Sequence, residues 1–306
     1  MFTRTKKFMP SLPGRDAFKG EVVHSSHLRS ANQVENQHVV VVGGGKSAVD
    51  CAVAASKAPG TTVTFATRTP HWATPRKIFD LIPFEYIFLS RFGQALVVGF
   101  MGPVPGLKSW RICHAVCHAL GWFVSALIFK MFEFVFALQY HNMCGATAQL
   151  GKVSLVSDFY GQSQILNYDL RDQVRAGKVK WLCGSGPTAF TKDGIKIGDQ
   201  EVRADVVIFA TGFHKDYDVF PRTVQSKLQI ELDGLYLWRH TIPVNVPNLA
   251  FVGSELAGIS NISLYGVQAA WVAKYWSGRM EVPSPEEMQE EIEATKAWKR
   301  RWMPES

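Results

Sequence analysis

The chain has 306 residues, of which 47% are hydrophobic and 19% are charged, and its formal net charge is +7. This composition suits one large globular domain or two ordinary ones and excludes an intrinsically disordered protein. The basic balance suits a phosphate-bearing ligand or an anionic membrane surface, and is weak support for nucleic acid. Five cysteines, an odd and sparse set, indicate a reducing compartment, and the N-terminus lacks the apolar core of a secretory signal. We therefore expect a cytoplasmic protein.

The first part of the chain predicts a βαβ unit. Residues 1–37 carry PSLPG and scattered polar residues, which predict loop and turn. HVVVV at 38–42 is a β-branched run typical of a parallel strand covered on both faces. Small amphipathic residues at 47–57 predict a helix, and TTVTFATR at 61–68 predicts the next strand.

Residues 81–140 differ in character, because they are strongly apolar with helical spacing. The run 119–129 continues to 139 and approaches the length of a membrane span, but Lys130 and Glu133 interrupt it. Two interpretations remain open. The helix is buried within an insertion that roofs a substrate channel, or it lies on a membrane surface.

Patterns typical of strands and helices alternate again after residue 150. The pattern predicts a helix over 164–177, a strand over 178–182, and short strands joined by Asp-Gly and Gly-Asp turns over 188–202. Further strands are expected within 204–213 and 248–253, and helices over 263–277 and after Ser284. Ser284, Pro285 and Glu287 form the pattern of a capping box at the start of the last helix.

The glycine turn after the first strand has the pattern Gly43-x-Gly45-x-x-Ala48 and opens a helix, as in dinucleotide-binding folds. Gly43 permits a tight turn, Gly45 lets the backbone approach a pyrophosphate, and Ala48 allows close helix–sheet packing. Lys46 and Ser47 add a charge and a hydroxyl donor at the helix N-terminus. The alternative is a glycine-rich turn that holds no ligand.

The residue type at the end of the second predicted strand indicates which nucleotide cofactor binds. A free ribose 2′-hydroxyl is usually met there by Asp or Glu, and a 2′-phosphate by Arg. This sequence has Arg68 and Thr69 at that place and no acid. A guanidinium binds phosphate through two parallel hydrogen bonds, so the sequence predicts NADP(H). The alternative is an ordinary exposed arginine at a strand end.

Several motifs in order resemble the flavin-containing monooxygenase family, in particular its fungal, dimethylaniline monooxygenase-like members. They are FKGEVVHSSHL (18–28), VVVVGGGKSAVD (39–50), RTPHW (68–72) and ADVVIFATGF (204–213). The family signature matches at Phe18, Gly20 and His24 and departs at Leu28, where an aromatic residue is expected.

The resemblance implies an α/β protein in which an NADPH domain is inserted into an FAD domain. It implies a flavoprotein oxidoreductase that uses NADPH, FAD and O₂ to transfer one oxygen atom to a small lipophilic or specialised-metabolite substrate. Thr211, Gly212, Gly253 and Gln268 then correspond to residues that line the flavin.

The family's first glycine fingerprint, which holds the FAD pyrophosphate, is missing from residues 1–37. The chain therefore resembles a member that lacks the N-terminal FAD-binding segment, and retention of FAD is in doubt. The alternative to an active monooxygenase is a truncated, non-catalytic NADP(H)-binding remnant or accessory that needs another chain to complete a flavin site. We expect a residual FAD-domain segment and linker at 1–34, a Rossmann-type NADPH domain at 35–205 with a helical insertion near 78–145, and an FAD-domain remainder at 206–306.

Two further patterns are weighed against simpler explanations. Cysteines and histidines at 113–118 and 141–144 suggest zinc, but the stretch is apolar and the spacing fits no standard finger, so we expect no metal site. KAWKRRW at 296–302 suggests nucleic acid or anionic lipid, but helical spacing favours an amphipathic terminal helix. We expect a small-molecule substrate, no nucleic acid, and association with the cytosolic face of a membrane only through 81–140. The sequence identifies no catalytic acid, base or nucleophile.

Overall fold

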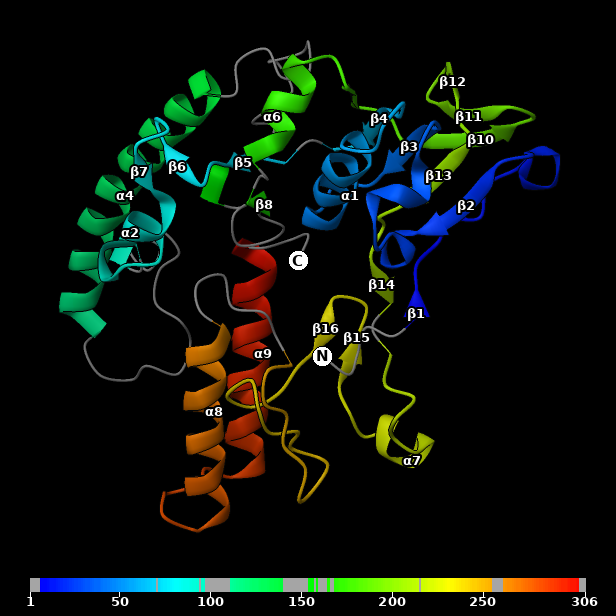
Figure 1. Ribbon diagram of the computed structural model, residues 1–306. Helices are drawn as coiled ribbons and strands as arrows, with labels where there is room; N and C mark the ends of the chain where they lie inside the picture. Colours follow the sequence, from blue (N-terminus) through cyan, green and yellow to red (C-terminus); the bar gives the residue numbers. More distant parts are fainter. Residues whose placement is uncertain are drawn as a thin grey trace. The chain divides into compact units, whose positions relative to one another are not determined.

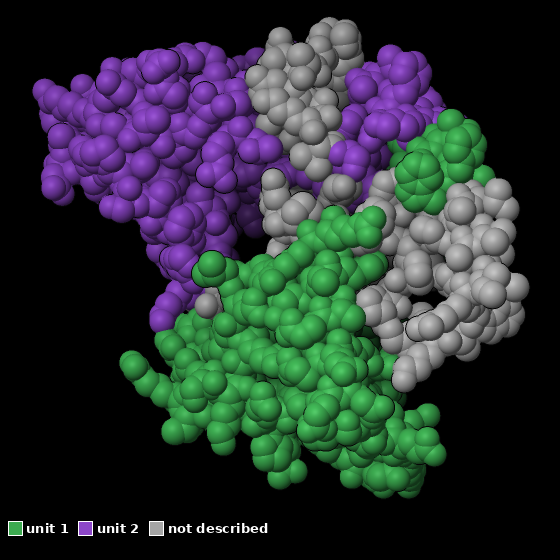
Figure 2. Space-filling view, turned by 180° about the vertical axis from the view of Figure 1, so that it is seen from behind, with its two compact units in different colours: residues 1–5, 85–129, 215–306 green, residues 6–84, 130–214 purple. Residues whose placement is uncertain are grey.

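The structure is a computed structural model that describes residues 6–69, 71–93, 95–96, 111–139, 154–156, 158, 164–165, 168–214, 216–254 and 261–302. The chain divides into two compact units, coloured separately in Figure 2. Unit 1 consists of residues 1–5, 85–129 and 215–306, and unit 2 of residues 6–84 and 130–214. The helix α4 (Arg111–Gln139) begins in unit 1 and ends in unit 2.

Unit 2 is built on a five-stranded parallel sheet with the order β2-β13-β3-β4-β9 (Figure 1). Its strands are β2 (Glu21–His24), β13 (Val206–Phe209), β3 (His38–Val42), β4 (Thr62–Thr67) and β9 (Val179–Cys183). In the register of the central strands, Val41 lies opposite Ile208 on one side and Phe65 on the other. The expected α/β class and the βαβ unit are confirmed.

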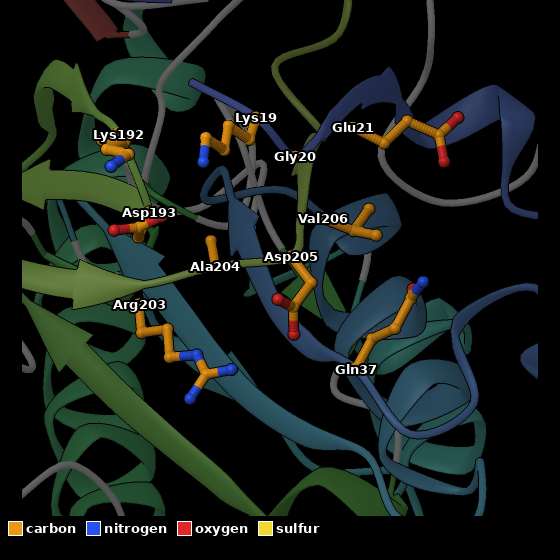
Figure 3. A pocket seen from close by; sticks show the side chains of 10 residues that line it. All are labelled: Lys19, Gly20, Glu21, Gln37, Lys192, Asp193, Arg203, Ala204, Asp205 and Val206. Carbon is orange, nitrogen blue, oxygen red and sulfur yellow. The ribbon is translucent and has the colours of Figure 1, made fainter. Parts of the chain in front are cut away.

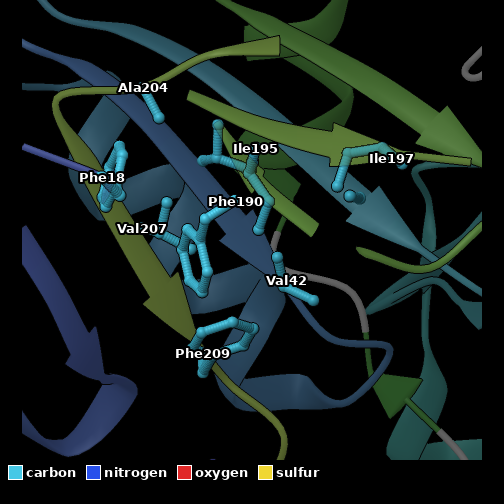
Figure 4. Packing of buried hydrophobic residues seen from close by; sticks show 10 residues of the cluster. Phe18, Val42, Phe190, Ile195, Ile197, Ala204, Val207 and Phe209 are labelled. Carbon is cyan, nitrogen blue, oxygen red and sulfur yellow. The ribbon is translucent and has the colours of Figure 1, made fainter. Parts of the chain in front are cut away.

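Different elements cover the two faces of this sheet. Phe190 and Ile195, from an antiparallel meander, pack against Val42 and Phe209 of the sheet (Figure 4). Because side chains alternate along a strand, Val41 points to the opposite face, where α1 (Lys46–Ser56) contacts β3 and β4 and α6 (Tyr168–Arg175) contacts β9. The meander consists of β10 (Pro187–Thr191), β11 (Gly194–Ile197) and β12 (Gln200–Arg203).

The strand β2 corrects the expectation that residues 1–37 form only loop and turn. It pairs with β13, from Glu21 opposite Val206 to His24 opposite Phe209. Four residues with two valines give a weak local signal, and the partner strand lies far away in the sequence. The sheet therefore joins segments that the expected three-part division placed in different domains, while their assignment to FAD or NADPH domains stays a prediction.

Several short elements complete unit 2. Three small strand pairs, one parallel and two antiparallel, and three 3-10 turns connect the larger elements. They are β1 (Lys6–Lys7) with β14 (Phe213–His214), β5 (Ala73–Thr74) with β8 (Gln164–Ile165), β6 (Lys77–Ile78) with β7 (Ile82–Pro83), and η1 (Arg15–Ala17), η2 (Ser25–His27) and η3 (Ala31–Val34). The helix expected over 164–177 starts only at Tyr168, because Gln164 and Ile165 pair with β5.

Unit 1 has a core between its C-terminal helices and a tight loop. Trp238, Val272 and Met288 are buried together there. The elements are α7 (Arg222–Gln225), β15 (Ile230–Glu231), β16 (Gly234–Leu235), α8 (Asn261–Trp276) and α9 (Pro285–Trp302), with α2 (Phe84–Phe88) at the boundary of the two units. The predicted capping box is confirmed, since the Ser284 and Glu287 side chains accept from each other's backbone N–H groups.

The strand expected over 248–253 is wrong, because the chain there is irregular. Asn248 and Gly253 both have positive φ, at 59° and 76°, which a strand does not accommodate. The Phe251 N–H donates instead to the carbonyl oxygen of Thr241 at 2.7 Å.

The basic C-terminal helix is anchored through its charges. Arg300 donates to both Glu231 and Asp233 of the β15–β16 hairpin, and Lys296 pairs with Glu231 at 2.6 Å. The hydrogen bond from Arg300 holds the pKa of Asp233 well below its usual range. Lys296, Lys299 and Arg300 also lie over the ring of Tyr236, whose pKa is raised by burial and by its hydrogen bond to Asp233. These contacts hold α9 against the β15–β16 hairpin. Two of the basic side chains of α9, Lys296 and Arg300, are therefore already paired with the carboxylates of Glu231 and Asp233.

The helix α4 has a buried stripe and an exposed stripe. Ser125, Phe129, Phe132 and Phe136 are buried, whereas other large apolar side chains lie open to solvent. The exposed set is Trp122, Phe123, Val124, Leu127, Met131, Phe134 and Leu138. Within 121–139, 28% of the residues in the most apolar window are buried, so most of this described stretch is exposed, and both interpretations of it stay predictions.

Candidate dinucleotide-binding site

The glycine turn joins β3 to α1 in a position where only glycine fits. The Gly43 N–H donates to the carbonyl oxygen of Ala66 in β4 at 3.1 Å, and the Ala210 N–H donates to the carbonyl oxygen of Val42 at 2.8 Å. A β-carbon on Gly43 would lie 2.4 Å from the carbonyl oxygen of Ala210 and 3.2 Å from Cβ of Ala48. Gly43 also has φ at 150°, a conformation that L side chains rarely adopt. The ends of three strands therefore meet at this glycine.

At position 45, neither a close neighbour nor a positive φ requires glycine. Gly45 is the N-cap of α1, with an ordinary φ of −87°, and no side chain caps this helix N-terminus. A β-carbon on Gly45 would meet nothing within 4 Å. Ser47 is exposed in the first turn, and Ala48 is fully buried against the sheet. The helix N-terminus is thus open, and its free N–H groups and dipole suit an anion.

Arg68 follows the last residue of β4 and is exposed, as is Thr69. Its aliphatic stem lies along Gly186, where an added β-carbon would be 3.9 Å from Cβ and Cδ of Arg68. Among the described residues Arg68 has no ion pair or side-chain hydrogen bond. Lys46, in contrast, is paired with Asp50 on the same helix. Within the described part of the chain, the charge of Arg68 at the carboxyl end of β4 is thus not neutralised by an acidic side chain.

The ATG segment at 210–212 is held by a network that includes the family-signature histidine. His24 is fully buried, and its Nδ1 accepts from the Ser26 N–H while its Nε2 donates to the carbonyl oxygen of Gly212 at 2.9 Å. The Thr211 hydroxyl donates to the carbonyl oxygen of Phe8 at 2.5 Å. The edge strand β2 thereby fixes the loop that follows β13.

Gly253 and Gln268 lie together within unit 1. The Gly253 N–H donates to Oε1 of Gln268 at 2.9 Å, and Gln268 is buried. A β-carbon on Gly253 would lie 3.1 Å from the ring of Tyr265. Gly253 therefore sits close against α8, and these two predicted residues are brought together.

Sequence reasoning gave no role to Gly44, His71 and Asp158. His71 lies beside Gly44 and is hydrogen-bonded to Asp158 at 2.7 Å, across 87 residues of sequence. His71 belongs to the quoted RTPHW motif, but no local pattern pointed to Asp158 as its partner. Only the folded chain brings this pair to the glycine turn.

The structure does not test the zinc pattern of cysteines and histidines. No group of three or more His, Cys, Asp or Glu side chains there is arranged to hold a metal ion. The side chains of residues 113–118 and residues 141–144 lie outside the described set. Burial raises the pKa of the Cys51 thiol to about 11, with a smaller contribution from Asp50, so this cysteine is protonated and unreactive at neutral pH.

A cavity of about 680 Å³ lies at the other edge of the same sheet (Figure 3). It is lined by Lys19, Gln37, Arg203 and Asp205, next to the amino ends of β2, β3 and β13. Asp205 is already engaged, since its Oδ2 accepts from the His38 N–H at 2.7 Å. Ligands of open parallel sheets bind outside the carboxyl ends of the strands, so this cavity is separate from the candidate site.

Comparison with known families decides the classification. The model of the family described as FMO-like, flavin-binding monooxygenase-like, matches residues 2–105 and 148–306. The chain belongs to this family. The unmatched stretch, 106–147, contains all of α4.

Curated relatives of this flavin-binding monooxygenase-like chain are similar over nearly its whole length. It is 25% identical to the FAD-dependent monooxygenase resA of Aspergillus sclerotiorum, covering 97% of this chain and 63% of that protein. It is 26% identical to human flavin-containing monooxygenase 1, covering 97% of this chain and 51% of that protein. The chain thus spans about half to two thirds of the length of these relatives.

Solved structures show the same fold. The open crystal structure of cyclohexanone monooxygenase superimposes with a TM-score of 0.62 at 15% identity, covering 97% of this chain and 66% of that one. S-allyl-L-cysteine S-oxygenase from Allium sativum gives a TM-score of 0.54 at 17% identity, covering 99% and 47%.

The two glycines of the turn predict opposite outcomes when changed to alanine. Gly43→Ala places a methyl group against the Ala210 carbonyl, so we expect a clear fall in the melting temperature, by about 5 °C or more. Gly45→Ala meets open space and costs only the weaker N-cap preference, so its melting temperature should fall by less than about 3 °C. Its NADPH affinity should nevertheless drop, because the methyl group enters the space next to the open helix N-terminus.

Thermal unfolding by fluorimetry and NADPH titration by calorimetry measure both effects. Gly266→Ala is the control, because this glycine of α8 also has no neighbour within 4 Å and, like Gly45, has no positive φ. Equal destabilisation by the Gly43 and Gly45 changes would contradict the assignment of separate roles.

Proposed function

We propose that this chain carries the NADP(H)-binding part of an NADPH- and FAD-dependent monooxygenase that transfers one oxygen atom from O₂ to a small lipophilic or specialised-metabolite substrate. The observation that carries the proposal is the combination of an open glycine turn with an unpaired arginine at the end of the next strand. Membership of the flavin-binding monooxygenase-like family gives the reaction class.

The residues present fit NADP(H). Gly43 and Gly45 leave a cradle without side chains at the N-terminus of α1, suited to the pyrophosphate. Arg68 stands at the end of β4, where the 2′-phosphate of the adenosine ribose belongs in this fold class. No described ion pair competes for its guanidinium, so a phosphate can take both of its hydrogen-bonding edges. Thr69 offers a hydroxyl next to it.

The fit to FAD is incomplete in the residues described. The segment 6–37 forms β1, β2 and 3-10 turns and contains no α-helix whose N-terminus could receive a second pyrophosphate. We propose that Thr211 and Gly212 of unit 2 contribute to lining the flavin, and the same role for Gly253 and Gln268 of unit 1 stays a prediction from the resemblance. When bound, FAD would supply the redox chemistry, and the described segment 6–37 offers no second helix N-terminus for its phosphates. The alternative is therefore a non-catalytic NADP(H)-binding remnant or an accessory that completes its flavin site with another chain.

The choice between NADPH and NADH tests the role of Arg68. Arg68→Ala removes a charge-assisted contact to the 2′-phosphate, so we expect the NADPH dissociation constant to rise about tenfold or more while that of NADH stays within about twofold. Both constants are measured by quenching of protein fluorescence.

Arg203→Ala is the matched control, because Arg203 is also exposed and lies at the cavity on the other edge of the sheet. Its change should leave both affinities as they are. Equal affinity of the parent protein for NADPH and NADH would contradict the assignment.

Flavin content tests the cofactor proposal as a whole. Because no second pyrophosphate cradle occurs in residues 6–37, we expect the purified chain to bind NADPH but to carry well under one equivalent of FAD. Absorbance of the flavin released on denaturation gives the ratio. A full equivalent of FAD, with NADPH oxidation coupled to O₂ uptake, would show that this chain holds flavin by itself and would refute the remnant.

A second proposal concerns location, and the exposed stripe of α4 supports it. We propose that Phe123, Leu127 and Phe134 enter the interface of a membrane and hold the protein at its cytosolic face. Their side chains are 64–66% exposed, on a helix with mean hydropathy 1.7 over 121–139.

Cosedimentation with vesicles of phosphatidylcholine and phosphatidylserine measures this association. The double change Phe123→Ser and Phe134→Ser should lower the bound fraction at least tenfold in partition coefficient, since each buried phenylalanine contributes about 1.5–3 kcal/mol. The control is Val219→Ser with Leu232→Ser, which removes two exposed apolar side chains elsewhere. Equal loss in both variants, or no binding by the parent chain, would refute the proposal.

A further inference from the structure

A carboxylate–imidazole pair lies next to the glycine turn. His71 Nδ1 is 2.7 Å from Oδ1 of Asp158, and the other carboxylate oxygen accepts from the backbone N–H of Trp72. The side chains of His71 and Asp158 are 11% and 6% exposed. Both oxygens of the acid are thus used to hold one short segment that follows Arg68 in the chain.

This arrangement fixes the tautomer and the direction of the imidazole. An ionised carboxylate only accepts hydrogen bonds, so Nδ1 of His71 must carry a proton and donate it. The ring cannot rotate without breaking that bond. Its opposite edge, formed by Cδ2 and Nε2, therefore faces away from Asp158, as the second nitrogen does in carboxylate-oriented histidines generally.

That edge faces the glycine turn. A β-carbon built on Gly44 would lie 3.3 Å from both Cδ2 and Nε2 of His71. Gly44 immediately precedes Gly45, the open N-cap of α1. Among the described residues Nε2 has no hydrogen-bond partner. A nitrogen with one free hydrogen-bonding position thus stands beside the turn that is suited to a pyrophosphate.

We propose that His71 is a phosphate-binding residue of this turn and that Asp158 is its positioning residue. In the bound state Nε2–H of the imidazolium donates to a pyrophosphate oxygen, while Nδ1–H donates to Asp158. This inference rests on the proposed binding of NADP(H) and adds a second basic contact to it. Arg68 contacts the 2′-phosphate that distinguishes NADPH from NADH, whereas His71 contacts the pyrophosphate that both dinucleotides contain.

A core histidine that only fills space beside Gly44 is the competing explanation. The two explanations differ in what the ring must provide. Packing requires an aromatic ring of similar size, whereas phosphate binding requires an N–H donor at the position of Nε2. His71→Phe keeps the ring and removes the donor, and His71→Gln keeps a donor on a side chain without the ring.

The test measures dissociation constants of the parent chain and its variants for NADPH and NADH by calorimetry. His71→Phe should raise both constants by about tenfold, the effect of one charge-assisted hydrogen bond, and leave their ratio unchanged. His71→Gln should recover part of this loss. Adenosine 2′-monophosphate, which lacks a pyrophosphate, should bind the His71→Phe variant and the parent equally, and Arg68→Ala more weakly.

Asp158→Asn tests the positioning role. The amide still accepts from the Trp72 N–H but cannot hold the imidazolium, so both constants should rise several-fold. In the double variant with His71→Phe the two losses should not add, because both act through one contact. Melting temperatures within about 3 °C of the parent establish that each variant is folded.

Each outcome decides between the alternatives. Parent-like affinity of His71→Phe for both dinucleotides overturns the inference and leaves the proposed function intact. A loss confined to NADPH also overturns it, because the contact would then be to the 2′-phosphate. If the parent chain binds neither dinucleotide, the proposed function fails and this inference with it.

Discussion

The close approach of two backbones at Gly43 is the constraint on which this site depends. Hydrogen bonds from Gly43 to Ala66 and from Ala210 to Val42 tie together the carboxyl ends of β4, β3 and β13. The carbonyl oxygen of Ala210 lies only 2.4 Å from where a β-carbon of residue 43 would be, so no other residue fits without shifting the strands. Because α1 starts directly after this turn, the same contact fixes where the open helix N-terminus lies.

In the proposed site, residues from different segments around the turn would contact different parts of one dinucleotide. Arg68 lies at the end of β4 and is free to meet a phosphate, while Lys46, closer in sequence to the glycines, is paired with Asp50. His71 and Asp158 come from segments that share no secondary structure with the turn. A strongly charged ligand would therefore meet basic groups from different segments, which allows affinity and cofactor selectivity to be changed separately.

The stretch outside the family match, 106–147, contains the long apolar helix α4. The sheet, the meander and the C-terminal helices lie within the matched residues, whereas α4 lies in the unmatched stretch 106–147. Seven of its large aromatic and aliphatic side chains are exposed between Trp122 and Leu138. The candidate dinucleotide site and the exposed stripe of α4 thus belong to separate parts of the sequence and can be tested separately.

The sequence by itself determined the βαβ unit, the meander and the capping box of α9, because these depend on local patterns of burial, turn geometry and capping. It also indicated Gly43, Gly45 and Arg68 as candidate site residues. It did not reveal β2, which is only four residues long and is defined by pairing with β13. It also predicted a strand at 248–253 that the positive φ values of Asn248 and Gly253 exclude. The contact of His71 with Asp158, and of His24 with Gly212, was decided by tertiary structure alone, since hydrogen bonds between residues 87 and 188 positions apart leave no periodic trace in a sequence.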